Sequence, residues 1–466
     1  MAFTFAFYLF TFALLSMPSE PLAAAVRWIN ERIANDSQIG PDLFTQLHAA
    51  QLERGLRHGD RTIGSFLRPF VLPRSTYQAI AHAAETLAAA FEQLVERALS
   101  DESLLAELAL TEREARLARI DPGYTRLCVS SRLDAYLSKG SFKFLEYNAE
   151  SPAGIVDQML LEDIFFELPY MREFIARYPF WRPRPHQRLL GALVDAYRQS
   201  GGAKDRPQIA IIDWEGVSTE SEFYVLKDYF ESEGYPTVIA DPCHLEYNHG
   251  VLTARGLTVD ILYKRVLIHE LLDKVDDGHP LLRAYAERKV CVANSFRTKV
   301  AHKKMSFAIL SDPRYESLFT PEQVTVIQHH VPWTRRVREG ETTFGGAVFE
   351  MTDLLRRERE RLVLKPNDDY GGQGVVIGHV TEPHTWEEAC ELALTRPFVV
   401  QELVPVQKET MPKFTDRLAW EEMTIDFDPF LFLNKVEGGI VRLSSSALSN
   451  VSSGGGVTAL LVLEDA

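Results

Sequence analysis

Four polar residues at alternate positions in two neighbouring segments are the first candidates for chemistry: Arg132 and Asp134 in one, Glu146 and Asn148 in the other. Residues two apart in a strand share a face. A hairpin centred near Gly140 would therefore set Asp134 opposite Glu146 and Arg132 opposite Asn148. Two carboxylates and an amide oxygen suit Mg²⁺, especially Mg²⁺ carrying nucleotide phosphates, and Arg132 could hold a phosphoryl oxygen or a carboxylate. A solvated strand face with cross-strand salt bridges is the alternative.

A second candidate is a strand that ends in Lys365 and is followed by the glycine-rich turn Gly371-Gly372-Gln373-Gly374. Glycines let backbone N–H groups approach phosphate oxygens closely, and the lysine supplies a positive charge for the same phosphates. No GK[ST] sequence follows and the chain continues as a strand, so this is not a Walker A loop. An ordinary hairpin turn is the alternative.

The apolar run FVVQELV, residues 398–404, is the third candidate. Gln401, Glu402 and Val404 lie at its end, where backbone groups could read the edge of an adenine base. A plain core strand is the alternative, and it is the simpler interpretation of the run taken alone.

Three kinds of element must position these residues. Ala-, Leu- and Glu-rich segments with helical apolar spacing predict helices over residues 20–120. Strand–helix–strand alternation over 204–300 predicts a parallel α/β unit, and its first turn lacks a GxGxxG fingerprint. Strand-like runs from 301 onward predict an α+β part with mostly antiparallel pairing. The predicted fold class is thus α/β combined with α+β.

Charge and cysteine content narrow the functional class. The 466 residues include 50 Lys+Arg and 65 Asp+Glu, a formal net charge of −15. This argues against a sequence-independent nucleic-acid binder, which needs a basic face. The 4 cysteines are far apart, so neither a disulfide framework nor a zinc site is expected, and a reducing cytoplasm is the predicted location.

Residues 1–19 carry no charged side chain, and their apolar centre is short for a membrane span. It resembles the apolar region of a signal peptide, but the first basic residue is Arg27, after it rather than before it. We interpret Met17 as the true start and do not expect a membrane-tethered protein.

Taken together, the R-x-D and E-x-N pairs, the lysine strand and the apolar run resemble the ATP-grasp ligases. The resemblance is to their circularly permuted branch, which includes the synthetase domain of glutathionylspermidine synthase. Asp134, Glu146 and Asn148 match that family's Mg²⁺ ligands in type and spacing. Asn148 precedes Lys365 in this chain, whereas ordinary ATP-grasp enzymes have the phosphate lysines first.

The segment 290–310 resembles the family's strand–Asn–helix element whose lysine contacts the ATP phosphates. Lys304 aligns best with that lysine, and the adjacent Lys303 remains an alternative. The resemblance implies that Lys365 is the second phosphate lysine, that 371–374 covers the phosphates, and that 401–404 is the adenine hinge.

The resemblance also implies an activity: phosphoryl transfer from ATP to a carboxylate, followed by attack of an amine on the acyl phosphate. The implied cofactors are ATP and Mg²⁺, and the partners are a small-molecule or peptide carboxylate and an amine. Arg132 would be the catalytic residue, stabilising the transferring phosphoryl group. An ATP-dependent phosphotransferase and a degenerate nucleotide- or peptide-binding scaffold are the alternatives. The substrates and the oligomeric state stay open.

Substrate contacts are predicted more loosely. Arg442, Asn450 and the loop Gly454–Gly456 could bind substrate or phosphate, and a plain turn is the alternative for the loop. Asp426 and Asp428 could be exposed strand residues. Glu222 and Arg265 are further candidates, with a surface salt bridge as their alternative.

The implied domain order is a helical region over 1–120 and a first ATP-grasp part over 121–203. A Rossmann-like pre-ATP-grasp domain over 204–300 and a second ATP-grasp part over 301–466 follow.

Overall fold

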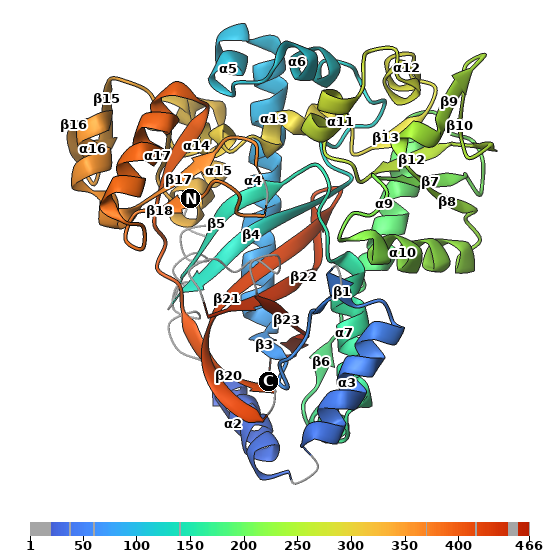
Figure 1. Cartoon of the computed structure of the whole chain (residues 1–466), viewed down its shortest axis with the longest axis vertical. Helices are drawn as coiled ribbons and strands as arrows, with labels where there is room; N and C mark the ends of the chain where they lie inside the picture. The colour runs from blue at the N-terminus through green and yellow to red at the C-terminus, as the bar shows by residue number, and fades with distance from the viewer. Residues whose placement is uncertain are drawn as a thin grey trace.

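A computed structural model describes residues 20–36, 39–58, 61–138, 141–369, 371–414, 417–445 and 455–465. A long antiparallel sheet lies at the centre, with a smaller mixed region on either side (Figure 1). The strand order of the central sheet is β23-β22-β21-β4-β5, and β20 also pairs with β21. Its strands are β4 (Ser130–Ser138), β5 (Ser141–Asn148), β20 (Lys408–Phe414), β21 (Leu418–Phe432), β22 (Lys435–Ser444) and β23 (Gly456–Thr458).

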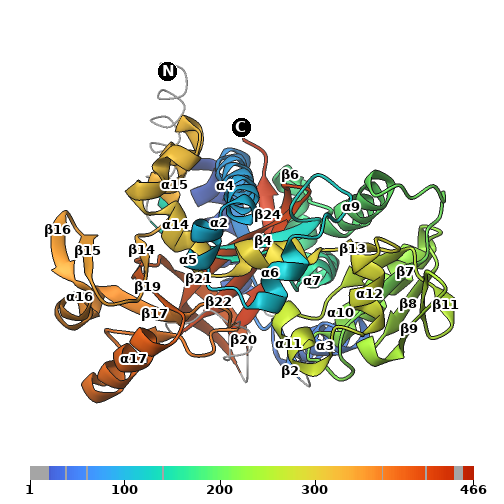
Figure 2. The ribbon, with the colours of Figure 1, turned by 90° about the horizontal axis from the view of Figure 1, so that it is seen from above.

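Helix α4 (Arg74–Ser100) covers one face of the central sheet (Figures 1 and 2). Its apolar residues recur at helical spacing, and Ile80, Leu87 and Phe91 are fully buried. The ring of Phe91 stacks on that of Tyr147 in β5 with 4.5 Å between centroids. The N-terminal helices therefore share a core with the hairpin that carries the predicted metal ligands.

The helical prediction for 20–120 is confirmed in the main. The helices are α2 (Glu20–Asn35), α3 (Pro41–Glu53), α4, α5 (Glu102–Glu107) and α6 (Glu112–Ala118). Short strands interrupt them: β1 (Arg57–His58), β2 (Arg61–Thr62) and β3 (Phe70–Pro73). Strand β3 pairs in parallel with β24 (Leu460–Leu463), which pairs antiparallel with β6 (Phe180–Trp181). Local spacing could not reveal β3, because its partner lies at the other end of the chain.

The parallel unit over 204–300 is confirmed. Its sheet has the order β13-β12-β7-β8, and every pairing is parallel. The strands are β7 (Ile209–Ile212), β8 (Thr237–Ala240), β12 (Ile261–Lys264) and β13 (Cys291–Ala293). Helices α9 (Pro185–Gln199), α10 (Glu220–Ser232), α11 (Ile268–Lys274) and α12 (Pro280–Ala286) accompany them. A small antiparallel sheet adds β9 (Leu245–Asn248), β10 (Val251–Ala254) and β11 (Leu257–Thr258).

The predicted antiparallel pairing after residue 301 is also confirmed. A second sheet has the order β14-β19-β17-β18 with antiparallel neighbours throughout. Its strands are β14 (Thr334–Arg336), β17 (Leu362–Pro366), β18 (Val376–Ile377) and β19 (Phe398–Glu402). Around it lie α14 (Met305–Leu310), α15 (Pro321–His330), β15 (Glu341–Phe344), β16 (Ala347–Glu350), α16 (Met351–Arg357) and α17 (Pro383–Thr395).

The remaining helices join these parts: α7 (Ile155–Glu167), α8 (Pro169–Arg177) and α13 (Lys299–His302). Helix α7 follows β5 after the loop 149–154, and α13 follows β13. Within the described ranges, no helix combines the length and the apolar character needed to cross a membrane.

Candidate functional site

The hairpin β4–β5 has the predicted register. Arg132 pairs with Asn148 and Asp134 pairs with Glu146, and a bulge follows between Asp134 and Ala135. Because side chains alternate along a strand, these residues lie on the face opposite to the one on which Tyr147 packs against α4. The side chains of Arg132 and Asp134 are only 11% exposed, so this is not the solvated strand face of the alternative interpretation.

Asp134 is held by donors on both oxygens. Its Oδ1 accepts from Arg132 Nε and from Asn148 Nδ2, each at 2.8 Å. Its Oδ2 accepts from Arg132 Nη2 at 3.0 Å and from Arg442 Nη2 at 2.7 Å. Arg132 and Arg442 lower the pKa of Asp134, even though burial by itself would raise it. Asp134 is therefore a charged anchor for two guanidinium groups.

Asp426 and Asp428 complete this ionic cluster from β21. The expectation that they are exposed strand residues is wrong, because Asp426 is 3% and Asp428 0% exposed. Arg442 Nη2 lies 2.5 Å from Asp426 Oδ2 and 2.8 Å from Asp428 Oδ2. Burial raises the pKa of Asp426 and of Asp428, Asp134 raises each further, and Arg442 opposes the shift. The sequence did not reveal this burial because it depends on pairing with β4, far away in the chain.

Lys304, and not Lys303, faces the hairpin. Lys304 Nζ lies 3.3 Å from Glu146 Oε1 and donates to the Asp369 carbonyl at 2.5 Å. Lys303 Nζ instead lies 2.6 Å from Asp368. Two adjacent lysines that the sequence left as alternatives thus have different surroundings.

Lys365 lies on the same side as the acidic hairpin. Its Nζ donates to Gln401 Oε1 at 2.6 Å and to the Leu145 carbonyl at 3.5 Å. Burial lowers the pKa of Lys365 to about 8, and nearby Lys304 adds to the effect while Glu146 opposes it. The structure therefore brings the lysine strand and the acidic hairpin into one site.

The glycine-rich turn joins β17 to β18, as predicted. Gly371, Gly372 and Gly374 have φ values of 62°, 78° and 67°, a region that favours glycine. A Cβ on Gly374 would lie 2.7 Å from Pro366 Cγ. Gln373 is an exposed residue of the same turn. The backbone is thus constrained where phosphate binding was expected.

The predicted hinge residues do not act alike. Gln401 is 3% exposed, and its side chain accepts from Lys365 and donates to Thr334 Oγ1 at 3.0 Å. Glu402 and Val404 instead line a cavity of about 730 Å³ together with Leu403. Gln401 therefore positions a lysine, while the next residues border a space large enough for a base.

Arg265 and Glu222 are buried, so a surface salt bridge is the wrong alternative. Their side chains are each 3% exposed and lie 3.4 Å apart. Arg265 Nη1 donates to the Pro152 carbonyl at 2.5 Å, and Glu222 accepts from the Ile155 backbone N–H at 2.8 Å. Arg132 Nη1 donates to Ala153 of the same loop at 2.9 Å. This loop connects the parallel unit to the ionic cluster.

The C-terminal candidates are only partly described. Asn450 and Gly454 lie outside the described residues. Gly456 begins β23, and a Cβ there would lie 2.9 Å from Phe66 Cε2. That close approach gives Gly456 a packing role.

Asp369 was missed by the sequence analysis. Its carbonyl holds Lys304 Nζ, which places this exposed residue beside Glu146. An acidic residue four positions after Lys365, just before the glycines, was the available signal.

No family model matches the sequence. The chain is 30% identical over 337 residues, 68% of its length, to a Frankia casuarinae protein that bears the name "Putative glutamate--cysteine ligase 2-2". It is 28% identical over 215 residues, 43% of its length, to the correspondingly named protein 2-3 from Frankia alni. These matches span only 36% and 23% of the two relatives, so the names describe proteins much longer than the matched region. Neither is named a glutathionylspermidine synthase.

A solved structure resembles nearly the whole chain. It is a glutathione synthetase-like effector from Globodera pallida in its apo form, with a TM-score of 0.59 and 12% identity. The alignment covers 92% of this chain and 99% of that one. The chain therefore shares its fold with a glutathione synthetase-like protein and part of its sequence with proteins named as ligases.

Proposed function

We propose that this protein is an ADP-forming ligase that uses ATP to join a carboxylate to an amine through an acyl phosphate. The observation that carries the proposal is the meeting of Lys304 and Lys365 with Glu146 in one site. These residues come from three separate segments. The names of the two sequence relatives support amide-ligase chemistry, and glutamate and cysteine are candidate substrates to test rather than assigned ones.

In this proposal the two lysines and the glycine-rich turn bind the triphosphate. Lysine ammonium groups supply positive charge, and the left-handed glycines can turn backbone N–H groups towards phosphate oxygens. The base would occupy the cavity beside Glu402 and Val404. Gln401 would keep Lys365 in place beneath the phosphates.

The oxygen donors also fit Mg²⁺, with one change to the predicted set. Both oxygens of Asp134 are occupied by nitrogen donors, which leaves that carboxylate no free lone pair for a metal. Glu146 contacts Lys304 through Oε1, so its second carboxylate oxygen can bind a metal. Asn148 donates through Nδ2, which leaves its Oδ1 as an acceptor. We assign Glu146 and Asn148 as ligands. Bound Mg²⁺ would neutralise phosphate charge.

The chain's own residues then perform three tasks. Arg132, fixed by Asp134, presents a guanidinium where the transferring phosphoryl group would pass, a role worth about 2.7–4 kcal/mol in comparable sites. Lys304 and Lys365 hold the ATP in line with the acceptor carboxylate. The amine then attacks the acyl carbon, forms the amide bond, expels phosphate and loses a proton.

Substrate residues belong to the same proposal. Arg265, paired with Glu222, and the loop 150–154 border the ionic cluster, and Arg265 is the candidate for holding the carboxylate substrate. Arg442 supports the cluster from β22, and Asn450 remains a candidate from sequence alone. The circularly permuted order is also part of the proposal.

The decisive experiment is an ADP-release screen of amino acids and short peptides against amines, with mass spectrometry of the product. A ligase gives ADP together with a product whose mass equals that of the carboxylate substrate plus the amine minus water. A phosphorylated product with no amine incorporated would instead indicate a phosphotransferase. Calorimetry that detects no binding of a non-hydrolysable ATP analogue with Mg²⁺ would contradict both activities.

A further inference from the structure

A second ionic cluster lies behind the proposed phosphate site, built from Glu114, Glu150, Lys299, Lys303 and Asp368. Lys299 Nζ lies 2.8 Å from Glu150 Oε1 and 2.5 Å from Asp368 Oδ1. Lys303 Nζ lies 2.6 Å from Asp368 Oδ2 and 3.0 Å from Glu114. Lys299 and Glu150 have no solvent exposure. Glu114, Glu150 and both ammonium groups are thus buried together, and the half-buried Asp368 closes the cluster.

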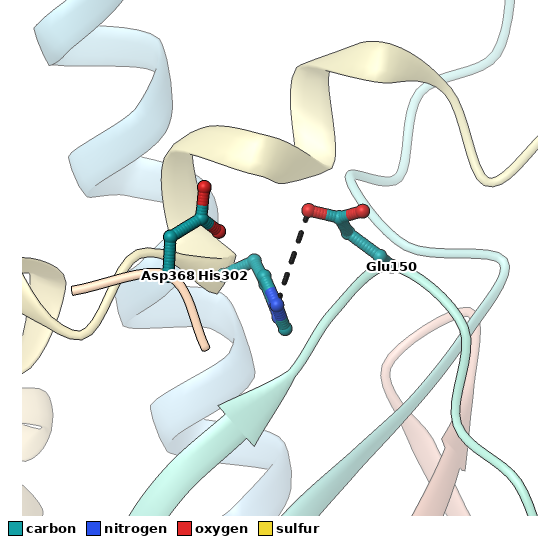
Figure 3. A group of neighbouring side chains, drawn as sticks. All are labelled: Glu150, His302 and Asp368. Carbon is teal, nitrogen blue, oxygen red and sulfur yellow. Dashed lines mark ion pairs between the residues drawn. The ribbon is translucent and has the colours of Figure 1, made fainter. Parts of the chain in front are cut away.

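Two carboxylates of this cluster, together with the neighbouring His302, have the composition of a metal site. Glu150, His302 and Asp368 each offer a ligand atom, and these atoms all lie within 4.8 Å of one another. Figure 3 shows the His302 ring between the two carboxylates. Neither ring nitrogen of His302 has a hydrogen-bond partner among the described residues.

The ammonium of Lys299 decides between a metal site and an ion network. It contacts both Glu150 and Asp368, so it occupies the place between the carboxylates that a metal ion would need. Burial by itself would raise the pKa of Glu150, yet the Lys299 ammonium lowers it. Burial lowers the pKa of His302, which favours a neutral ring. A divalent ion beside this buried ammonium would face strong repulsion.

The cluster joins segments that carry the proposed ATP site. Asp368 comes three residues after Lys365 and precedes Asp369, whose carbonyl holds Lys304. Glu150 comes two residues after Asn148, and its Oε2 accepts the Ile268 N–H at 2.7 Å. Ile268 begins α11 of the parallel unit.

We propose that Lys299 is the resident cation of this cluster, and that Asp368 and Glu150 act through it as positioning residues that align the phosphate lysines with the metal ligands. The inference rests on the proposed function, because it concerns how the ATP site is aligned. It requires no metal at Glu150, His302 and Asp368. It also predicts that breaking the cluster alters nucleotide binding and not stability alone.

The first test uses Asp368→Asn in the full chain and the affinity for a non-hydrolysable ATP analogue with Mg²⁺. Loss of a residue that orients binding groups should weaken affinity by about 10- to 100-fold. The matched control is Glu162→Gln, which breaks the buried 2.7 Å pair with Arg182 away from the site. The control should lower the melting temperature and leave the affinity unchanged. Equal affinity in wild type and Asp368→Asn would overturn the inference.

The second test asks whether the Lys299 ammonium or a metal ion occupies the position between Glu150 and Asp368. Lys299→Ala should bind the analogue weakly, and added methylammonium should restore affinity. If Lys299→Ala does not fold, Lys303→Met breaks the cluster from the other side of Asp368 and should also weaken binding of the analogue. Without nucleotide, wild-type protein and His302→Ala should bind the same amount of Mn²⁺, as measured by electron paramagnetic resonance. A Mn²⁺ ion lost in His302→Ala would establish the metal site instead.

The two levels of proposal fail differently. If wild-type protein binds no ATP analogue, the ligase proposal fails and the positioning role fails with it. If wild type binds normally and Asp368→Asn binds equally well, only the positioning role fails.

Discussion

Gln401 holds Lys365 from the neighbouring antiparallel strand. Its Oε1 accepts a hydrogen bond from the lysine Nζ at 2.6 Å. The sequence placed Gln401 in a nucleotide hinge, but its side chain is buried and also contacts Thr334. A neutral acceptor keeps the lysine in place without providing a counter-charge. The cation therefore remains available for an incoming phosphate.

The titration of Lys365 should govern nucleotide affinity at alkaline pH. Its pKa is lowered to about 8 by burial, so the ammonium is progressively lost above that pH, and affinity for the ATP analogue should fall. Lys365→Met should bind weakly at every pH and lack this dependence. Calorimetry between pH 6.5 and pH 9 (roughly the range that brackets the titration) measures it.

Lys264 is the control for this titration, because burial also lowers its pKa to about 8. Lys264→Met should keep the alkaline loss of affinity. Loss of the dependence in that variant, or its persistence in Lys365→Met, would contradict the assignment. The titration of Lys365 changes the free energy of unfolding in the opposite direction to nucleotide affinity: stability increases as the pH rises. The depressed folded-state pKa costs stability below about pH 8, and this cost disappears as the pH rises towards about 10.4.

Replacing Gln401 with glutamate should shift that pH dependence. A carboxylate 2.6 Å from Nζ would favour the ammonium and raise the pKa of Lys365. The fall in affinity should then occur at higher pH, and affinity at neutral pH should drop because the new carboxylate competes with phosphate. Gln401→Leu removes the acceptor and should weaken binding by about 10-fold without an upward shift. Identical pH profiles for the two variants would exclude the positioning role.

Asp134 and Glu146 should differ in what they contribute, although they pair across one hairpin. Asp134→Asn removes the charge that Arg132 and Arg442 share inside the protein. It should cost about 3–5 kcal/mol in the free energy of unfolding. Glu146 is 23% exposed and, among the described residues, pairs with Lys304 alone, so Glu146→Gln should destabilise the fold less than Asp134→Asn and abolish Mg²⁺-dependent nucleotide binding. Urea denaturation and calorimetry on both variants separate the roles.

Arg132→Lys should reduce turnover more than binding. A lysine cannot reproduce the two-pronged contact with Asp134, so the charge near the phosphoryl group would be displaced. We expect ADP release to fall by about 10²- to 10³-fold, with an ATP-analogue affinity near that of wild type. Arg182→Lys, in a buried pair away from the site, is the matched control. A proportional loss of binding and turnover in Arg132→Lys would point to a ground-state role.

Much of the local structure follows from sequence. Alternation around Gly140 predicted the register of β4 and β5, because side chains in a strand alternate strictly between faces. Apolar runs separated by helical patterns predicted the parallel sheet at 204–300. These features depend on neighbouring residues, so a single sequence contains them.

Charge partners depended on the tertiary structure. Asp428 looks like an ordinary strand residue until β21 pairs with β4 and buries it completely. Lys303 and Lys304 differ only in the direction their side chains take from one short segment, and packing against Asp368 and Glu146 sets that direction. The sequence by itself determined which residue types and elements were present. Pairing between distant segments decided which charges are buried together, because the cost of an unpaired buried charge is settled only by what the fold places beside it.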